Sequence, residues 1–319
     1  MCLIMFDVPA ILDVIKARNA KTVGLQFPEG LKRRGPALAK ELEEKAGVLV
    51  IVSGDPCYGA CDIDEGLLDL VDVLFHFGHS RLSDDDRIVF MEYYHEADVE
   101  QCVINALPML GQKVGVATTV QHIHRLNDII RILMKAGKEP VVAKGDSRIA
   151  YPGQVLGCNF SAVPADVDSI LYVGSGNFHP MGMRLAHKVP VIAADPFTGE
   201  ARAVDVEKIM KQRYAVMAKS MDAKKWGILI GMKSGQRRLE LAKKIKELAG
   251  DGVLIAIKEI TPDRLLAFKV DAFVSTACPR LAIDEAGRFP APVLTPVEFE
   301  IVKGLRKWED LAFDEIKDV

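Results

Sequence analysis

The chain has 319 residues, 49% of them hydrophobic and 27% charged, a composition that excludes intrinsic disorder and predicts burial of roughly 75% of the unfolded surface. Its 41 Lys and Arg residues and 44 Asp and Glu residues leave a net charge of -3, which excludes a chain-wide basic field of the kind that binds nucleic acid. No apolar stretch is long enough for a membrane span, and Asp7 and Asp13 interrupt the apolar N-terminus where a signal peptide needs a continuous run, so we expect a cytoplasmic protein without membrane contact.

The N-terminal third of the chain alternates between strand-like and helix-like apolar patterns. We expect strands at 22–27, 48–54 and 71–78, a helix over 31–47 and a short helix near 65–70. The strands are continuous runs of Val, Ile, Leu and Phe, which are typical of strands buried on both faces of a parallel sheet. Residues 91–110 are predicted to form a helical connection to the next part.

The same alternation occurs twice more. In the second part we expect strands at 113–118, 140–145 and 167–174 and a helix over 122–137 that ends at Gly137. In the third part we expect strands at 226–231, 253–260 and 270–277 and a helix over 236–250 that ends at Gly250. Glycine is common just after a helix, as at both of these ends. Residues 198–220 are predicted to be a second helical connection, and 297–316 a C-terminal helix and tail.

Matching strand openings indicate that one unit is repeated three times. Each part has a Gly at or near the start of one strand and a Val-Asp pair at the start of a later strand. The glycines are Gly24, Gly115 and Gly227, and the aspartates are Asp72, Asp168 and Asp271. The separations from Gly to Asp are 48, 53 and 44 residues, a nearly constant spacing.

The repeat predicts an α/β fold made of three similar small domains with short parallel sheets in a pseudo-threefold arrangement. We place the domains at 1–99, 100–200 and 201–319, and the third includes the C-terminal helix and tail.

The six cysteines are unusual for a reducing compartment, where structural disulfides are rare and packing, catalysis or metal binding are the remaining roles. In parallel α/β sheets the ligand-facing loops leave the carboxyl ends of strands. Four cysteines lie in such loops beside Gly or Pro: Cys57, Cys61, Cys158 and Cys278. Cys2 and Cys102 lie in apolar, helix-like segments, where we expect small buried hydrophobic residues.

Each predicted domain therefore has at least one loop cysteine. Three thiolates brought together at a domain junction would suit a 4Fe-4S cluster with one iron left open to substrate. Loop cysteines that are unrelated to one another are the alternative, and the spacing alone leaves both interpretations open. Cys57 and Cys61 begin like the C-x-x-x-C-x-x-C motif of radical S-adenosylmethionine enzymes, but the third position is Asp64, which disfavours a cluster built on this loop alone.

Several short motifs resemble those of one known family. They are FPEGL at 27–31, YGACD at 58–62, HFGHS at 76–80, GCN at 157–159, GMKSGQ at 231–236 and ACPRLAID at 277–284. Their order and their distribution over essentially the whole chain are similar to the archaeal diphthamide biosynthesis enzymes, the 2-(3-amino-3-carboxypropyl)histidine synthases.

This resemblance implies a homodimer in which Cys61, Cys158 and Cys278 of each chain hold a 4Fe-4S cluster, whereas Cys57 lies outside the family pattern. It also implies transfer of the 3-amino-3-carboxypropyl group of S-adenosylmethionine to an imidazole carbon of a histidine in translation elongation factor 2, the first step of diphthamide biosynthesis. That carbon is a poor nucleophile, which explains the use of a one-electron route. The cluster, reduced by an electron donor, would donate an electron to the sulfonium, and methylthioadenosine would be released.

Polar loop residues are the candidates for binding the cosubstrate. They are His79, Ser80, Gly176, His179, Ser234, Gly235, Gln236 and Arg280. The segment 231–238 enters a predicted helix N-terminus whose free N–H groups could bind a carboxylate, although a cap without a ligand is the commoner meaning. Either histidine alone is more often a hydrogen-bonded loop residue, and Arg280 could pair with the substrate carboxylate or with Asp284.

Two other functions remain as alternatives. One is a quinolinate synthase-like iron-sulfur enzyme, which shares the three-domain architecture with one cysteine per domain. The other is a non-catalytic iron-sulfur scaffold subunit. The motifs at 58–62 and 277–284 favour diphthamide synthesis, and the presence of all three cysteines favours an active enzyme.

Overall fold

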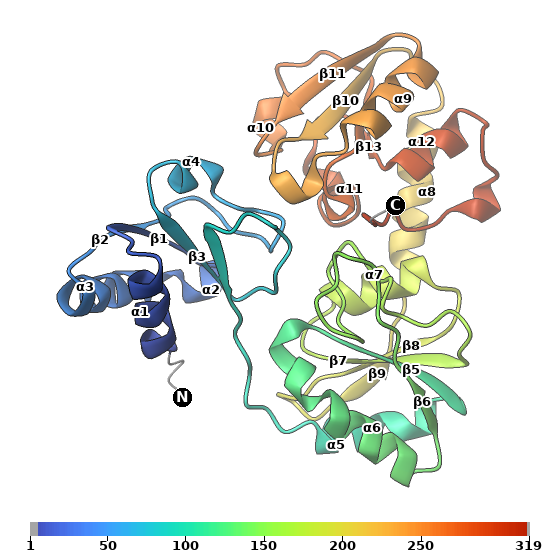
Figure 1. Cartoon of the computed structure of the whole chain (residues 1–319). Helices are drawn as coiled ribbons and strands as arrows, with labels where there is room; N and C mark the ends of the chain where they lie inside the picture. The colour runs from blue at the N-terminus through green and yellow to red at the C-terminus, as the bar shows by residue number, and fades with distance from the viewer. Residues whose placement is uncertain (1–5, 318–319) are drawn as a thin grey trace. The chain divides into compact units, whose positions relative to one another are not determined.

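The computed structural model describes residues 6–317, which contain three separate sheets (Figure 1). The chain divides into two compact units, Met1–Tyr93 and Tyr94–Val319. The first unit holds one sheet and the second holds two. The prediction of an α/β fold with three similar, mostly parallel sheets is confirmed, whereas the limits 1–99, 100–200 and 201–319 stay a prediction.

The first unit is a four-stranded parallel sheet in the order β2-β1-β3-β4. The strands are β1 (Thr22–Gln26), β2 (Leu49–Val52), β3 (Val73–Phe77) and β4 (Ile88–Met91), and the helices are α1 (Val8–Ala17), α2 (Glu29–Lys32), α3 (Gly35–Ala46) and α4 (Glu65–Leu68). Helices cover both faces of this sheet, and alternate side chains of β3 point to opposite faces. Val73 and Phe75 pack with α1 and α3, whereas Leu74 packs with α4.

The first sheet of the second unit has the order β6-β5-β7-β8-β9. Its strands are β5 (Lys113–Thr118), β6 (Glu139–Val141), β7 (Ser169–Val173), β8 (Val191–Ala194) and β9 (Ala201–Ala203), of which β9 alone pairs antiparallel. The helices are α5 (Glu100–Ala106), η1 (Leu107–Met109), η2 (Val120–Arg125), α6 (Leu126–Lys135) and α7 (Phe178–Ala186). Cys102 of α5 and Met183 of α7 pack on opposite faces of this sheet.

The second sheet of this unit has the order β11-β10-β12-β13 and is parallel throughout. Its strands are β10 (Trp226–Gly231), β11 (Gly252–Ile257), β12 (Ala272–Ser275) and β13 (Val293–Leu294). The surrounding helices are α8 (Glu207–Lys219), η3 (Ser234–Gln236), α9 (Leu239–Ala249), α10 (Pro262–Leu265), α11 (Pro279–Asp284), η4 (Ala286–Arg288), α12 (Pro296–Val302) and η5 (Trp308–Asp310).

The repeated Val-Asp pair has a structural role that is the same in all three sheets. The carboxylate of Asp72 accepts hydrogen bonds from the backbone N–H groups of Lys21 and Thr22, at 2.7 and 2.8 Å. In the same way, Asp168 accepts from Lys113 at 2.7 Å. Asp271 accepts from Lys224 and Lys225, at 2.9 and 2.8 Å. Each aspartate thus holds the start of the neighbouring strand, and these backbone bonds lower the pKa of Asp72 and of Asp271.

The repeated glycine is explained by close packing at two of its three positions. A Cβ at Gly24 would lie 2.8 Å from the side chain of Leu74, and one at Gly227 would lie 2.5 Å from the ring of Phe273. In both cases the glycine leaves room for a large side chain of the adjacent parallel strand.

The structure corrects several element predictions. A fourth parallel strand was missed in each sheet, namely β4, β8 and β13. The predicted connection 198–220 is helical only over α8 and begins with β9, and 91–110 is α-helical only over α5. The predicted helices over 122–137 and 236–250 begin as the separate 3-10 segments η2 and η3. These short strands and turns lack an apolar period long enough to identify them. The predicted C-terminal helix and tail over 297–316 are confirmed as α12, η5 and the segment that follows them.

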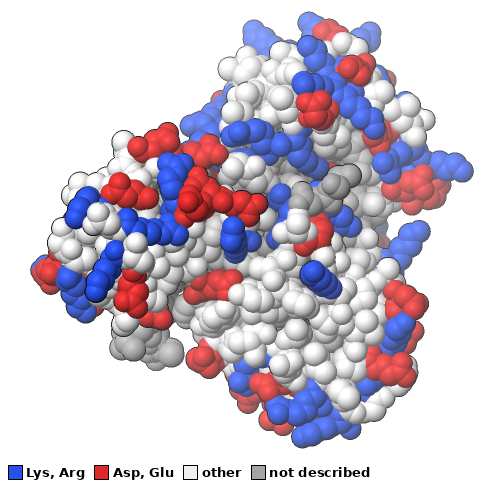
Figure 2. All heavy atoms as spheres, in the orientation of Figure 1, with Lys and Arg blue, Asp and Glu red and all other residues white. Residues whose placement is uncertain are grey.

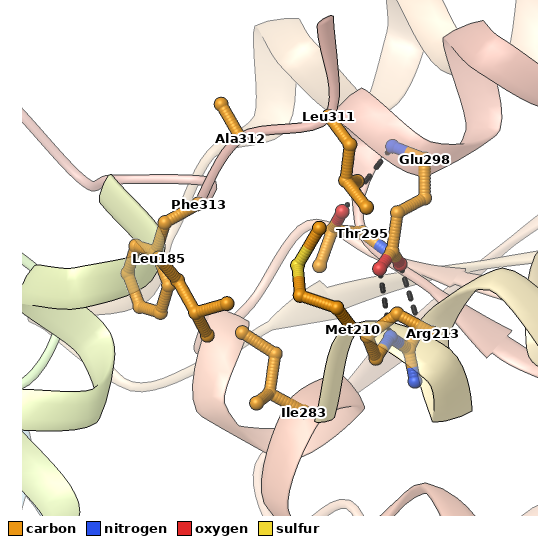
Figure 3. Close-up of a pocket in the computed structure, with 9 residues that line it drawn as sticks. All are labelled: Leu185, Met210, Arg213, Ile283, Thr295, Glu298, Leu311, Ala312 and Phe313. Atoms are coloured by element: carbon orange, nitrogen blue, oxygen red, sulfur yellow. Dashed lines mark hydrogen bonds and ion pairs between the residues drawn. The ribbon is translucent and has the colours of Figure 1, made fainter. Parts of the chain in front are cut away.

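A buried ion pair joins α8 to α12 in the second unit. Arg213 and Glu298 are each 3% exposed, and their two side-chain contacts measure 2.6 and 2.7 Å (Figure 3). Arg213 also donates to two carbonyl oxygens, those of Ala282 and Val293, and Glu298 accepts from the backbone of Thr295. The pocket beside this pair holds a cavity of about 20 Å³, far below the roughly 300 Å³ at which ligand sites begin, so it does not accommodate a cosubstrate.

The surface in Figure 2 carries Lys and Arg side chains interspersed with Asp and Glu, in keeping with the net charge of -3. Among the helices of residues 6–317, each is too short or too polar to cross a membrane.

Candidate functional site

The four loop cysteines lie where the sequence predicted, past the carboxyl ends of strands. Cys57 and Cys61 lie between β2 and α4, Cys158 lies between β6 and β7, and Cys278 immediately precedes α11. The five cysteines within residues 6–317 form no disulfide with one another, and Cys2 lies outside these residues.

Cys102 is a packing residue, as predicted. It is fully buried in α5, and its thiol lies 3.2 Å from the carbonyl oxygen of Val99. Burial raises the pKa of this thiol to about 11, which keeps it protonated and unreactive near neutral pH.

Arg280 lies in α11 of the second unit, two residues after Cys278. Its side chain is only 4% exposed and makes two hydrogen bonds to Asp284, at 2.8 and 2.9 Å. Burial lowers the pKa of the guanidinium, and Asp284 opposes this shift. The thiols of Cys278 and Cys158 oppose it as well, so Arg280 lies within electrostatic reach of both.

One nitrogen of this guanidinium lacks a hydrogen-bond partner among residues 6–317. It is Nη1 of Arg280, which is buried. An unpaired buried donor on a cation is costly, and an anion would satisfy it. Arg280 is therefore a candidate anion-binding residue beside the Cys278 loop.

The segment 174–180 after β7 approaches the same residues. The ring of Phe178 lies 4.0 Å from the guanidinium of Arg280, a cation–π contact. A Cβ at Gly157 would lie 2.2 Å from that ring, so glycine beside Cys158 permits this close packing. His179 stacks on Tyr172, and burial, followed by the charge of Arg280, lowers its pKa to about 4. The predicted residue Gly176 is exposed, with a φ of 73°.

The C-terminal tail contacts both cysteine loops of the second unit or their neighbouring residues. The sequence did not indicate these contacts. The backbone N–H of Ile316 donates to the carbonyl oxygen of Cys158 at 2.8 Å. Arg238 binds Asp314 through two contacts of 2.6 and 2.9 Å. The same guanidinium donates to the carbonyl oxygen of Ala277 at 3.0 Å. The tail thus connects the Cys158 loop with the residue before Cys278.

The predicted residues Ser234, Gly235 and Gln236 form the 3-10 turn η3, and α9 begins only at Leu239. The segment 231–238 thus leads into the N-terminus of α9, as predicted, with the turn η3 and the N-cap residue Arg238 before it. The end of the turn lies near the residue before Cys278, because a Cβ at Gly231 would lie 2.8 Å from Cβ of Ala277 and 3.3 Å from Cβ of Gln236. The carbonyl oxygen of Gly235 accepts a hydrogen bond from Arg148 at 2.9 Å.

In the first unit, the predicted residue His79 belongs to a buried polar chain. Nδ1 of His79 lies 2.9 Å from Nε2 of His76, and Nδ1 of His76 lies 2.8 Å from the Oε1 atom of Gln26. Burial lowers the pKa of His76 to about 3 and that of His79 to about 4. Ser80, the next predicted residue, is 2% exposed.

Asp64 is occupied by structural contacts. Its carboxylate accepts hydrogen bonds from Ser53 at 2.6 Å and from the backbone of Leu67 at 3.0 Å, where it caps α4. This agrees with the expectation that Asp64 does not replace the third cysteine of a local cluster motif.

Three parallel α/β sheets with cysteine loops at their carboxyl edges define the class of this protein. The family model of the diphthamide synthesis proteins matches residues 27–312. The chain belongs to this family.

Two curated relatives and one solved structure make the comparison specific. The 2-(3-amino-3-carboxypropyl)histidine synthase of Pyrococcus horikoshii is 40% identical over 96% of this chain and 92% of its own length. Subunit 1 of the Schizosaccharomyces pombe synthase is 31% identical over 96% of this chain and 75% of its own length. The crystal structure of Dph2 from Pyrococcus horikoshii with a 4Fe-4S cluster has a TM-score of 0.94 at 39% identity, covering 99% of this chain and 95% of that one.

These relatives confirm the prediction of a 2-(3-amino-3-carboxypropyl)histidine synthase in diphthamide biosynthesis. The motifs at 58–62 and 277–284 therefore led to the correct choice over the quinolinate synthase-like enzyme.

Proposed function

We propose that the chain uses S-adenosylmethionine as the donor of the 3-amino-3-carboxypropyl group and a histidine of translation elongation factor 2 as the acceptor. We further propose that Cys61, Cys158 and Cys278 hold the 4Fe-4S cluster. Cytoplasmic location, a homodimer and a separate electron donor complete the proposal.

The donor set fits such a cluster. Thiolates are the usual ligands of iron-sulfur clusters, and three of them leave one iron open to a substrate. The observation that carries the proposal is the buried Nη1 of Arg280, which lacks a partner within residues 6–317. Arg280 follows Cys278 by two residues, and its guanidinium contacts Phe178, which packs against Gly157 beside Cys158. When bound, the reduced cluster supplies the single electron that cleaves the bond between the sulfonium and the aminocarboxypropyl carbon.

The chain's own residues bind and orient the cosubstrate. Arg280 is the candidate partner for the carboxylate of the cosubstrate. Its Nε and Nη2 atoms donate to Asp284, which orients the guanidinium and leaves Nη1 as the donor for this carboxylate. His79, Ser80, Gly176 and the turn at Ser234, Gly235 and Gln236 are proposed to make the remaining polar contacts. The sulfonium of the cosubstrate has three bonds to carbon. The bond that breaks depends on which of these carbons the binding residues would hold next to the open iron of the cluster.

Product analysis under anaerobic conditions tests this function. We expect the reconstituted protein with dithionite to convert S-adenosylmethionine to methylthioadenosine and to label elongation factor 2 with the aminocarboxypropyl group. Release of 5'-deoxyadenosine would contradict the proposed orientation of the cosubstrate. Reactions with and without the elongation factor separate cluster chemistry from recognition of the protein substrate.

The homodimer is tested by light scattering of the eluted protein. A mass of twice 35.0 kDa is expected. A monomer that retains full activity would contradict this part of the proposal.

A further inference from the structure

Three potential metal ligands meet in the first unit. Cys57, His76 and His79 each offer one donor atom, and these three atoms lie within 4.8 Å of one another. Cys57 is 3% exposed, His76 is fully buried and His79 is partly buried. Thiolate and imidazole are both ligands of Zn²⁺, and two imidazoles with one thiolate also bind copper.

Hydrogen bonds fix which nitrogen of His76 carries its proton. Nε2 of Gln26 donates to the carbonyl oxygen of Asp62 at 2.7 Å, which orients the amide. Oε1 of Gln26 accepts from the backbone N–H of Asp64 at 3.2 Å and faces Nδ1 of His76 at 2.8 Å. Since Oε1 can only accept, Nδ1 of His76 must donate. The neutral ring therefore has its lone pair on Nε2.

This arrangement is typical of metal-binding histidines. Such histidines commonly donate the second ring N–H to a carbonyl or carboxylate oxygen, which fixes the orientation of the ring. Nε2 of His76 accepts the hydrogen bond from Nδ1–H of His79, so this nitrogen has the lone pair that an ion needs.

The distance between the rings is close to what an ion requires. Nε2 of His76 and Nδ1 of His79 are 2.9 Å apart. Two Zn–N bonds of about 2.0–2.1 Å at a tetrahedral angle place their nitrogens about 3.3 Å apart. An ion could thus replace the hydrogen bond between the rings with a small movement of His79.

We propose that Cys57, His76 and His79 form a Zn²⁺ site with a fourth position open to water. The Cys57 thiol loses its proton to solvent on binding, so one proton is released per ion. The proton on Nδ1 of His76 stays in place, whereas the proton that Nδ1 of His79 donates to His76 moves to Nε2 of His79, which frees Nδ1 for the ion. This ligand set shares no residue with Cys61, Cys158 and Cys278, and the site gives the surplus cysteine of the first unit a role. A hydrogen-bonded chain from Gln26 to His79 that binds no ion is the competing interpretation.

The test measures zinc in the full-length, anaerobically reconstituted protein. We expect one tightly bound Zn²⁺ per chain in competition with a chromophoric chelator. X-ray absorption at the zinc edge, which iron does not obscure, should give one sulfur at about 2.3 Å and two nitrogens at about 2.0 Å. No bound zinc, or two or more sulfur ligands, would overturn the proposal.

Ligand variants sharpen the test. Cys57→Ser and His79→Gln should each weaken zinc binding by more than 100-fold, a loss larger than the roughly 10- to 100-fold expected from Gln26→Met, which removes only the support of His76. His124→Gln, at an exposed histidine of the second unit, is the matched control and should change nothing. If Cys57→Ser does not fold, His79→Gln alone decides, and unchanged zinc affinity in that variant overturns the site.

Cysteine variants distinguish this site from the proposed cluster. Cys61→Ser should lose iron and keep zinc, whereas Cys57→Ser should lose zinc and keep iron. Loss of zinc in Cys61→Ser or Cys158→Ser would mean that zinc occupies the cluster cysteines, which overturns the inference. Absence of iron from every preparation would contradict the proposed cluster and leave the zinc result valid.

Discussion

The cysteine loops of the two units occupy equivalent places at the carboxyl edges of parallel sheets, but their surroundings differ. In the first unit, the buried thiol of Cys57 lies near two neutral imidazoles, His76 and His79. In the second unit, the buried cation Arg280 lies two residues after Cys278 and contacts Phe178, which packs against Gly157 beside Cys158. Imidazoles offer lone pairs to a metal ion, whereas a guanidinium offers N–H groups to an anion. The repeated backbone therefore carries two kinds of chemistry.

The part of the repeat that stays constant is structural. Asp72, Asp168 and Asp271 hold equivalent strand starts in both units. The residues that differ lie in the loops after the strands. In parallel α/β folds such loops commonly bind ligands and contribute little to the sheet itself.

The largest expected effect is loss of the cluster. Cys61→Ala, Cys158→Ala and Cys278→Ala should each abolish iron binding and methylthioadenosine formation, whereas Cys57→Ala should retain both. Iron content and visible absorbance of the reconstituted protein measure this difference. If Cys57→Ala loses the cluster and Cys61→Ala retains it, the two cysteines of the first unit have been assigned in the wrong order.

The buried ion pair of the second unit should have the next largest effect. Glu298→Gln leaves Arg213 charged and buried, so we expect the free energy of unfolding to fall by about 3–5 kcal/mol. Both tryptophans, Trp226 and Trp308, belong to the second unit, so denaturation followed by tryptophan fluorescence reports on that unit.

The matched control for this pair is an exposed one. Glu285→Gln breaks its contact with Arg288 and should cost only about 0–1 kcal/mol. Equal effects of the two variants would argue against a structural role for the buried pair.

Substitution of Arg280 tests whether its guanidinium binds the carboxylate of the cosubstrate. Arg280→Gln removes one charged hydrogen bond to the cosubstrate, and we expect KM for S-adenosylmethionine to rise roughly 10- to 100-fold, the equivalent of about 1.5–3 kcal/mol. Iron content should stay near that of the wild type. Arg288→Gln, an exposed arginine nearby in sequence, is the control. A change in kcat without a change in KM would contradict binding of the carboxylate by Arg280.

The smallest expected effect is a pH dependence in the first unit. The pKa values of His76 and His79 fall from 6.5 to about 3 and about 4 on folding. Between pH 6.5 and about 4 the unfolded chain therefore binds protons that the folded chain does not, so stability is lost as the pH falls through this range. His79→Gln should reduce proton uptake on unfolding by about one. Hydrogen exchange of β1 and β3 in metal-free protein, followed as a function of pH, measures the stability of the first unit. If His79→Gln has the same pH dependence of stability as the wild type, His79 is not its source.

The sequence predicted the central strands well and the peripheral ones poorly. The expected strands 113–118 and 226–231 agree with β5 and β10, since both are continuous apolar runs that are buried on both faces. β13 has only two residues, and β9 lies at an edge with the sequence Ala-Arg-Ala, so neither has a recognisable period.

Part of the candidate site was also visible in the sequence. The loop positions of Cys57, Cys61, Cys158 and Cys278 followed from strand ends, and Arg280 was singled out beside Cys278. The pairing of Arg280 with Asp284 was one of two alternatives, and the structure contains it, with Nη1 left without a partner among residues 6–317. The segment 231–238 was correctly placed before a helix, but the predicted helix started at Gln236 instead of Leu239, because polar residues do not distinguish a 3-10 turn from an α-helical start.

The sequence by itself determined the threefold repeat, the cysteine loops and the family, because each of these depends on local patterns or short motifs. Only the tertiary structure decided what surrounds the cysteines. The tail bond from Asn159 to Ile316 joins residues 157 positions apart, and the contact between Gln26 and His76 spans 50. Such contacts depend on where distant backbones pass each other, and no periodicity of hydrophobic residues encodes that.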